Sequence, residues 1–200
     1  MQDVEIVDLF KSPVYFTSLN LDNEKISKYC YQIKKKDNTG RVVSNRGGYQ
    51  SNDLEGSHPP LNNLFLEIEK HLNLFKIKLD VKDDYNIKIS NIWINISKSS
   101  NDNLAHNHPD SFLSGVYYVK TNDKSGNIWF SNPHKNVCYD WRPFLFNNNA
   151  QEHTIANTLW TMKSTVGKLI LFPGWLEHSV DCNKSNQDRI SISFNSSLYK

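Results

Sequence analysis

Two histidines separated by a single residue form the most chemically suggestive cluster of the sequence. In an extended segment, side chains at i and i+2 point to the same side, roughly 6–7 Å apart at the backbone. His106 and His108 have this spacing. Their imidazoles can therefore converge on one ion, with metal–nitrogen bonds of about 2.1 Å. A third ligand from a distant strand would complete a facial set and leave the opposite positions open, as in non-haem iron sites.

The preferred third ligand is His178, which follows the apolar run 168–173 (KLILFP) and the short segment 174–177 (GWLE). A histidine just beyond a buried strand points into the mouth of a barrel. The three cysteines of the chain form no Cys-x-x-Cys motif, so a zinc ribbon and a redox motif are both disfavoured.

A second ligand register competes with the first, because His108 and Asp110 also have one residue between them. His106 and Asp110 would lie roughly 13 Å apart in an extended chain and could not share an ion without a bend. Pro109 favours a strand end, which would leave Asp110 in the following loop. We therefore prefer His106 and His108, and the register with Asp110 stays open.

An anion site is indicated by the segment from Arg189 to Asn195, in which every second residue is polar and the residues between are apolar. The polar face of such a strand either meets water or lines a polar interior. Arg189 and Ser191 together suit a carboxylate, because the guanidinium binds both oxygens and the hydroxyl adds a third bond.

Other polar residues are candidates for the same interior. Tyr117 and Tyr118 are neighbours on a predicted strand and must point to opposite faces, so one should face the pocket, and we prefer Tyr118. Asn95 lies on another predicted strand. Tyr49 and Gln50 follow two glycines that predict a turn. Either that turn is purely structural, or its loop covers the site and these two residues touch substrate.

These side chains need a β-rich scaffold, and the hydrophobic pattern predicts one. Apolar residues at helical spacing indicate helices over 22–36 and after the two prolines at 59–60. Alternation with period two predicts strands at 87–96, 112–119, 127–130, 168–172 and 189–195. We expect a single domain, 1–200, that is mostly β: a helical support region to about residue 85, then a jelly roll or barrel over about 86–200.

The amino-acid composition limits the kinds of partner and location that we expect for this protein. The formal net charge is +2, from 23 basic and 21 acidic residues, and no basic block is dense enough to follow a phosphate backbone, so nucleic acid is disfavoured. No apolar run approaches the ~18 residues of a membrane span. The first residues lack the basic and apolar regions of a signal peptide, and the cysteines are few and odd in number, which predicts a reducing, cytoplasmic location.

Six phrases in this order resemble a family of small 2-oxoglutarate/Fe(II)-dependent oxygenases of bacteria and phages, within the double-stranded β-helix superfamily. They occupy residues 44–51 (SNRGGYQS), 93–95 (WIN), 106–109 (HNHP), 113–119 (LSGVYYV), 171–178 (LFPGWLEH) and 189–195 (RISISFN). The superfamily usually has His-x-Asp or His-x-Glu as its first motif. The narrower family resembles this chain in His-x-His-Pro, which favours His106 and His108 over the register with Asp110.

The resemblance implies an enzyme that uses Fe(II), 2-oxoglutarate and O2, most commonly for hydroxylation, in a bacterial or phage-infected cell. It implies that Arg189 and Ser191 hold the distal carboxylate of 2-oxoglutarate. Related enzymes also resemble this chain in having a tyrosine on the strand of Tyr118. The substrate would be a peptide side chain or a small molecule. A homodimer is the default expectation for the assembly.

Two other functions compete with the oxygenase. A cupin-like metal enzyme would not use 2-oxoglutarate, but no glutamate of the cupin motif follows His108, and the Arg189–Ser191 pair would be unexplained. A non-catalytic jelly-roll module, for carbohydrate binding or a virion structure, would leave both the histidines and Arg189 without a role.

Overall fold

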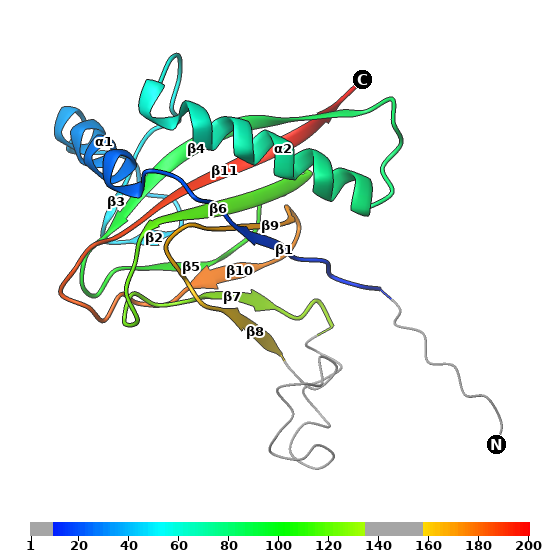
Figure 1. The fold of residues 1–200 in the computed structure, drawn as a ribbon. Helices are drawn as coiled ribbons and strands as arrows, with labels where there is room; N and C mark the ends of the chain where they lie inside the picture. The colour runs from blue at the N-terminus through cyan, green and yellow to red at the C-terminus, as the bar shows by residue number, and fades with distance from the viewer. Residues whose placement is uncertain (1–9, 135–157) are drawn as a thin grey trace, which may run out of the picture.

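Two antiparallel β-sheets face each other, and two helices cover the outer side of one of them (Figure 1). This arrangement is seen in a computed structural model, which describes residues 10–134 and 158–200. Within these residues, no helix is long and apolar enough to cross a membrane.

The larger sheet has six strands and carries most of the core. Their order is β1 (Tyr15–Ser18), β9 (Lys168–Pro173), β6 (Leu113–Lys120), β11 (Arg189–Tyr199), β4 (Asn86–Ser97) and β3 (Tyr49–Gln50). The two longest strands, β4 and β11, are paired along almost their full length. Residues that alternate along them are therefore sorted onto two faces, one toward the helices and one toward the second sheet.

The smaller sheet has five short strands. Their order is β2 (Asn45–Arg46), β5 (Asp102–His106), β10 (His178–Val180), β7 (Ile128–Ser131) and β8 (Leu159–Met162). It brings together segments that are far apart in the sequence, because β10 lies between β5 and β7.

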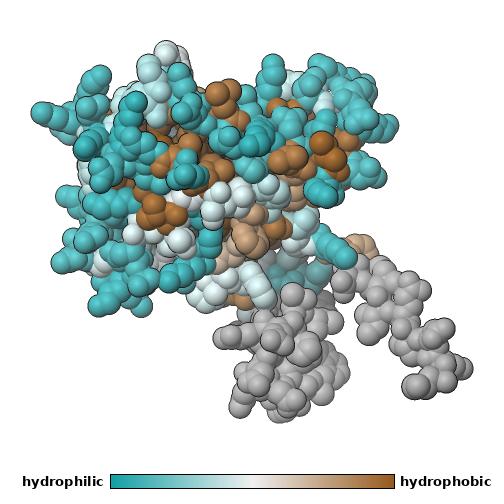
Figure 2. All heavy atoms as spheres, viewed as in Figure 1, coloured by the Kyte–Doolittle hydropathy of each residue, from teal (hydrophilic) through white to brown (hydrophobic). Residues whose placement is uncertain are grey.

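Helices α1 (Asn23–Lys36) and α2 (Asn62–Lys78) pack on the outer face of the larger sheet (Figure 1). The side chain of Asp22 caps α1 by accepting from the backbone N–H of Lys25 at 3.0 Å. A short 3-10 helix, Pro59–Leu61, leads into α2. The apolar stripe of α2 is buried against the sheet, and its exposed side is largely hydrophilic with small separate apolar patches (Figure 2).

The two faces of the larger sheet pack against different parts of the protein. On β6, Tyr117 and Val119 belong to the apolar cluster beneath the helices, whereas Val116 and Tyr118 belong to a second cluster between the sheets. The hydroxyl of Tyr117 donates to Asn23 Oδ1 at 2.8 Å, which joins β6 to the first turn of α1. The helix-side cluster therefore stabilises the sheet, and the inner face remains available for a cavity.

The predicted fold class is confirmed: the protein is mostly β, with two N-terminal helices against a two-sheet jelly roll. All five predicted strands and both predicted helices are present, with ends shifted by a few residues. Six short strands were not predicted: β1, β2, β3, β5, β8 and β10. The first three lie before residue 85, so the region expected to supply helices also supplies edge strands to both sheets.

Replacement of Phe194, which is fully buried on the helix side of β11, tests this packing. We expect Phe194→Ala to lower the free energy of unfolding by about 3–5 kcal/mol, because it removes a buried ring and leaves a cavity. Urea denaturation measures the change. Phe16→Ala is the matched control, because that ring is 61% exposed. Equal losses in the two variants would contradict the assignment of the core.

Candidate metal centre and anion pocket

The two sheet positions that carry His106 and His178 are directly opposite each other. His106 is the last residue of β5, His178 is the first of β10, and the two are paired in the antiparallel register. Their ring centroids are 4.3 Å apart. The sequence predicts that His178 follows the strand at 168–173. The structure adds that His178 is also the first residue of a separate short strand, β10.

His108 reaches the same point from two residues beyond the end of β5. Its backbone N–H donates to the carbonyl of Gly174 at 2.7 Å, which fixes the chain next to the turn before β10. A Cβ at position 174 would lie 2.7 Å from the carbonyl oxygen of His108 and 2.2 Å from that of Ser111, so only glycine allows this approach. The His108 ring centroid is 5.1 Å from that of His106 and 5.3 Å from that of His178.

Hydrogen bonds orient two of the rings. His106 Nδ1 lies 2.7 Å from the carbonyl oxygen of Leu104, and His178 Nδ1 lies 3.0 Å from that of Leu176. In a neutral imidazole, an Nδ1–H that donates to a carbonyl leaves the lone pair on Nε2. Metal-binding histidines are typically held in this way.

Burial keeps the three rings neutral. It lowers the pKa of His106, and it lowers the pKa of His108 to about 4, with a further contribution from the neighbouring His106. The pKa of His178 falls to about 3, mainly through burial and then through His106. Neutral imidazole is the form that binds a metal. The ligand nitrogens lie within 4.8 Å of one another, and in the described part of the chain no other cluster offers three such groups.

Asp110 takes no part in this cluster. It is exposed in a turn after Pro109, and the backbone N–H of Ser111 donates to the carbonyl of His108 at 3.1 Å across that turn. The alternative register, His108 with Asp110, is therefore not part of the three-histidine cluster that the described residues form.

A cavity of about 400 Å³ opens between the sheets beside the histidines. At one end lies Arg189, which is 2% exposed. Its Nη1 donates to the carbonyls of Ser125 and Asp181, at 2.6 and 2.9 Å, and its Nη2 to Ser97 Oγ at 3.4 Å. Burial lowers the pKa of this guanidinium. Among residues 10–134 and 158–200 no carboxylate forms a salt bridge with it, so this end of the cavity carries a buried positive charge that suits an anion.

Ser191 and Tyr118 complete this anion pocket, defined here as Arg189, Ser191 and Tyr118. They are partners in the β11–β6 register, and all three line the cavity. Burial raises the pKa of Tyr118 to about 12, against the opposing effect of the Arg189 charge, so the phenol stays protonated and can donate. Tyr117 points to the helices instead, which the alternation alone left open.

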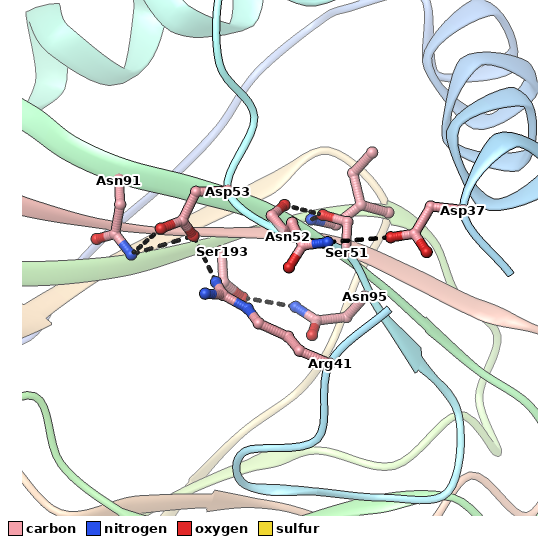
Figure 3. Close-up of polar contacts among 9 residues, drawn as sticks. Asp37, Arg41, Ser51, Asn52, Asp53, Asn91, Asn95 and Ser193 are labelled. Carbon is pink, nitrogen blue, oxygen red and sulfur yellow. Dashed lines mark hydrogen bonds and ion pairs between the residues drawn. The ribbon is translucent and has the colours of Figure 1, made fainter. Parts of the chain in front are cut away.

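Asn95 and Gln50 also line the cavity, whereas Tyr49 does not. Asn95 pairs with Ser191 across the ladder and donates from Nδ2 to Ser193 Oγ at 3.0 Å (Figure 3). Tyr49 is 5% exposed and belongs to the helix-side core. The prediction that Tyr49 contacts substrate is therefore corrected. Neighbouring residues of a strand face opposite sides, and Gln50 is the one that faces the cavity.

The sequence did not predict a place in the cavity for Arg41, Asn91 or Trp93, although all three line it. Arg41 donates to the carboxylate of Asp53, which also accepts from Asn91 Nδ2 at 3.3 and 3.4 Å (Figure 3). Asn91 and Trp93 share the face of Asn95 on β4, so the period-two pattern could have revealed them. Arg41 lies in a loop, where no periodic signal exists.

Comparison with known proteins places these features in context. Residues 91–195 match the model of a family described as "Putative 2OG-Fe(II) oxygenase". No curated protein matches the chain in sequence.

Several solved structures share the fold. A prolyl-4-hydroxylase of Pseudomonas putida has a TM-score of 0.63 and 11% identity, over 94% of this chain and 95% of that one. The collagen prolyl hydroxylase of Paramecium Bursaria Chlorella virus-1 has a TM-score of 0.58 and 15% identity, over 92% and 94%. HygX of Streptomyces hygroscopicus, with nickel, 2-oxoglutarate and hygromycin B bound, has a TM-score of 0.59 and 11% identity, over 92% and 82%. These likenesses identify the two-sheet fold as a double-stranded β-helix.

Metal binding tests the histidine cluster. We expect His178→Ala to weaken the binding of a divalent ion such as Ni(II) by about 100-fold or more, because it removes one of three ligands. Isothermal titration calorimetry measures the affinity. Asp110→Ala should bind the ion as the unmodified protein does. Loss of binding in the Asp110 variant, with retention in a His106→Ala variant, would reverse the assignment of the register.

Proposed function

Since the chain belongs to the 2OG-Fe(II) oxygenase family whose model matches residues 91–195, we propose that it hydroxylates a peptide side chain or a small molecule at the three-histidine centre. It is a 2-oxoglutarate-dependent oxygenase that uses Fe(II), 2-oxoglutarate and O2. The observation that carries the assignment of residues is the opening of the neutral histidine cluster into a cavity that also holds a buried arginine with no salt bridge among the described residues.

His106, His108 and His178 are the proposed ligands of the iron. Bound iron supplies the activation of O2 that is coupled to oxidative decarboxylation of 2-oxoglutarate. The protein's part is to keep the three imidazoles neutral, to hold their Nδ1 atoms on backbone carbonyls and to exclude water. Phe172 and Phe130 support the last role, with ring centroids 4.6 and 6.2 Å from that of His178.

The anion pocket is the proposed receptor for the distal carboxylate of 2-oxoglutarate. Arg189 offers the charge, and the hydroxyls of Ser191 and Tyr118 offer donors beside it. Since Arg189 Nη1 is already held by two carbonyls, the guanidinium is fixed before the ligand arrives. Asn95, beside Ser191, is proposed to contact the co-substrate as well.

The similar structures support both substrate classes. Two of them are named as prolyl hydroxylases, one of these for collagen, and HygX was solved with hygromycin B. A cupin-like enzyme without 2-oxoglutarate, or a non-catalytic module, would leave the buried Arg189 without a salt-bridge partner, since the described residues supply none. Neither alternative is favoured.

We also propose a reducing compartment such as the cytoplasm. Fe(II) is the metal form this chemistry requires, and Cys30 and Cys182 are free thiols. Burial raises the pKa of Cys30 to about 12, so this thiol is unreactive.

Removal of single hydroxyls tests the anion pocket. We expect Tyr118→Phe and Ser191→Ala each to raise the KM for 2-oxoglutarate by about tenfold, because each loses a hydrogen bond to a charged group. Arg189→Ala should raise it further. Succinate formation at varied 2-oxoglutarate measures the effect, and Lys70→Ala is the control, because Lys70 pairs with Glu67 on the exposed side of α2 and does not line the cavity. An unchanged KM in the Arg189 variant would remove the carboxylate assignment.

Coupled binding of metal and co-substrate tests the three-histidine proposal. Three neutral ligands leave the ion's charge uncompensated, so the 2-oxoglutarate dianion should raise the affinity for Fe(II), and Fe(II) should raise that for 2-oxoglutarate by the same factor. Anaerobic titration should show a weak visible charge-transfer band that fades as O2 is added and succinate forms. Iron binding without that band would favour the cupin-like enzyme.

A further inference from the structure

The floor of the cavity continues past the anion pocket along β4 and β11. Register partners on these strands form successive cross-strand pairs: Ser97 with Arg189, Asn95 with Ser191, Trp93 with Ser193, and Asn91 with Asn195. The first two pairs belong to the proposed co-substrate end. The last pair lies three steps beyond the first pair, roughly 20 Å along the strands, and two steps beyond the second, roughly 13 Å, at about 6.6–6.8 Å for every two residues. The last pair is therefore separate from the proposed co-substrate end and is available to another ligand.

The ladder changes at this last pair. Ser196 pairs with Ile89, so the register shifts just beyond Asn195. Such bulges commonly occur beside active sites, where they redirect side chains. The two amides are thus presented at the end of the regular ladder.

Asn91 offers an acceptor to the cavity. Its Nδ2 faces both carboxylate oxygens of Asp53, at 3.3 and 3.4 Å (Figure 3). This orientation is fixed by charge, because the amide oxygen would be repelled by the carboxylate. Asn91 Oδ1 is consequently left for another donor.

Asn195 offers a donor beside it. Its Oδ1 accepts from Ser114 Oγ at 2.7 Å, and its Nδ2 makes no hydrogen bond within the described residues. Directly opposite residues of an antiparallel pair have Cα atoms about 4.5–5.5 Å apart. An acceptor and a donor side by side at this spacing match one residue of an extended peptide, whose N–H and C=O point to the same side.

The surroundings disfavour charged and stacked ligands at this end. Arg41 is neutralised by Asp53, and no acidic residue or lysine lines the cavity in the described parts of the chain. Trp93 is the aromatic residue nearest to the two amides on β4. The Arg41 guanidinium lies over its ring at 5.7 Å from the centroid, so that face is not free to stack on a sugar or a base.

Exposed apolar residues at the rim of the cavity favour a ligand that extends beyond the cavity. Val43 and Leu104 line the cavity and are 67% and 49% exposed, and the adjacent Val42 is 84% exposed. A small polar metabolite would gain little from these apolar groups. A polypeptide that extends out of the cavity would cover them.

We propose that Asn91 and Asn195 form a peptide-recognition subsite, which binds the backbone N–H and C=O of one residue of an uncharged, extended polypeptide segment. The proposal rests on the proposed function, in that it takes the histidine centre as the place of reaction. Arg41 and Asp53 act as positioning residues, because Asp53 fixes the orientation of Asn91 and Arg41 holds Asp53.

The test uses the full chain with Zn(II) in place of Fe(II) and with 2-oxoglutarate bound, so that no turnover occurs. The probes are twenty capped pentapeptides, Gly-Gly-Xaa-Gly-Gly, with glucose and adenosine as probes of other classes. NMR follows the side-chain NH2 resonances of Asn91 and Asn195. We expect at least one peptide to shift both resonances, and an analogue with one amide replaced by an ester to bind about tenfold more weakly.

Matched variants separate recognition from folding. Asn195→Leu and Asn195→Asp should each weaken peptide binding by about tenfold, because both remove the donor. Asn86→Leu, an exposed position at the start of β4, should leave peptide binding unchanged. Equal peptide binding by the Asn195 variants, shifts of both resonances by glucose or adenosine in place of peptide, or no peptide response at all would overturn the subsite.

A separate titration of 2-oxoglutarate keeps the two proposals apart. Normal 2-oxoglutarate affinity without peptide binding would overturn the subsite alone. Absence of 2-oxoglutarate binding would overturn the proposed co-substrate site, and peptide shifts at Asn91 and Asn195 would still support the subsite in that case.

Discussion

The antiparallel pairing of β5 with β10 is the constraint on which the site depends, because it sets His178 directly opposite His106. Side chains alternate faces along a strand, so a slip of one residue would send one of these rings out of the cavity. β10 has only three residues, and it is held between β5 and β7, both of which pair with it. The close approach of Gly174 to His108 then brings the third ring to the same point. The geometry of the histidine cluster is thus a property of sheet register and one turn.

A second constraint is the buried charge of Arg189. A guanidinium that is 2% exposed needs partners, and the structure supplies carbonyls from Ser125 and Asp181 but no carboxylate within the described residues. This arrangement holds the cation in place without a direct ion pair among the described residues, which favours an anionic ligand over a purely structural role. The three histidines are neutral and add no negative charge to a bound divalent ion, and Arg189 adds a positive charge. A dianionic ligand would balance these charges.

One face of the larger sheet contributes to stability, and the other face forms the cavity. Toward the helices, the isoleucines of β4 and β11 form an apolar core with α1 and α2. Toward the smaller sheet, the alternate positions of the same strands are Asn, Trp, Arg and Ser residues that line the cavity. Because the helices bury one face so completely, the other can be polar without loss of the fold. The same separation explains why Tyr117 is a core residue and its neighbour Tyr118 belongs to the anion pocket.

The sequence by itself determined the periodic features: the long strands, both helices, the polar face of β11, and the spacing that places His106 and His108 on one side. These follow from local geometry, in which a period of two or 3.6 residues is enough to define a face. Only the tertiary structure decided which face is buried, that Tyr118 and Gln50 face inward while Tyr49 does not, and that Asp110 lies in an exposed turn outside the histidine cluster. It alone revealed the short strands β5 and β10 and the position of Arg41, because segments this short or irregular acquire their conformation from their partners across the sheet and not from their own sequence.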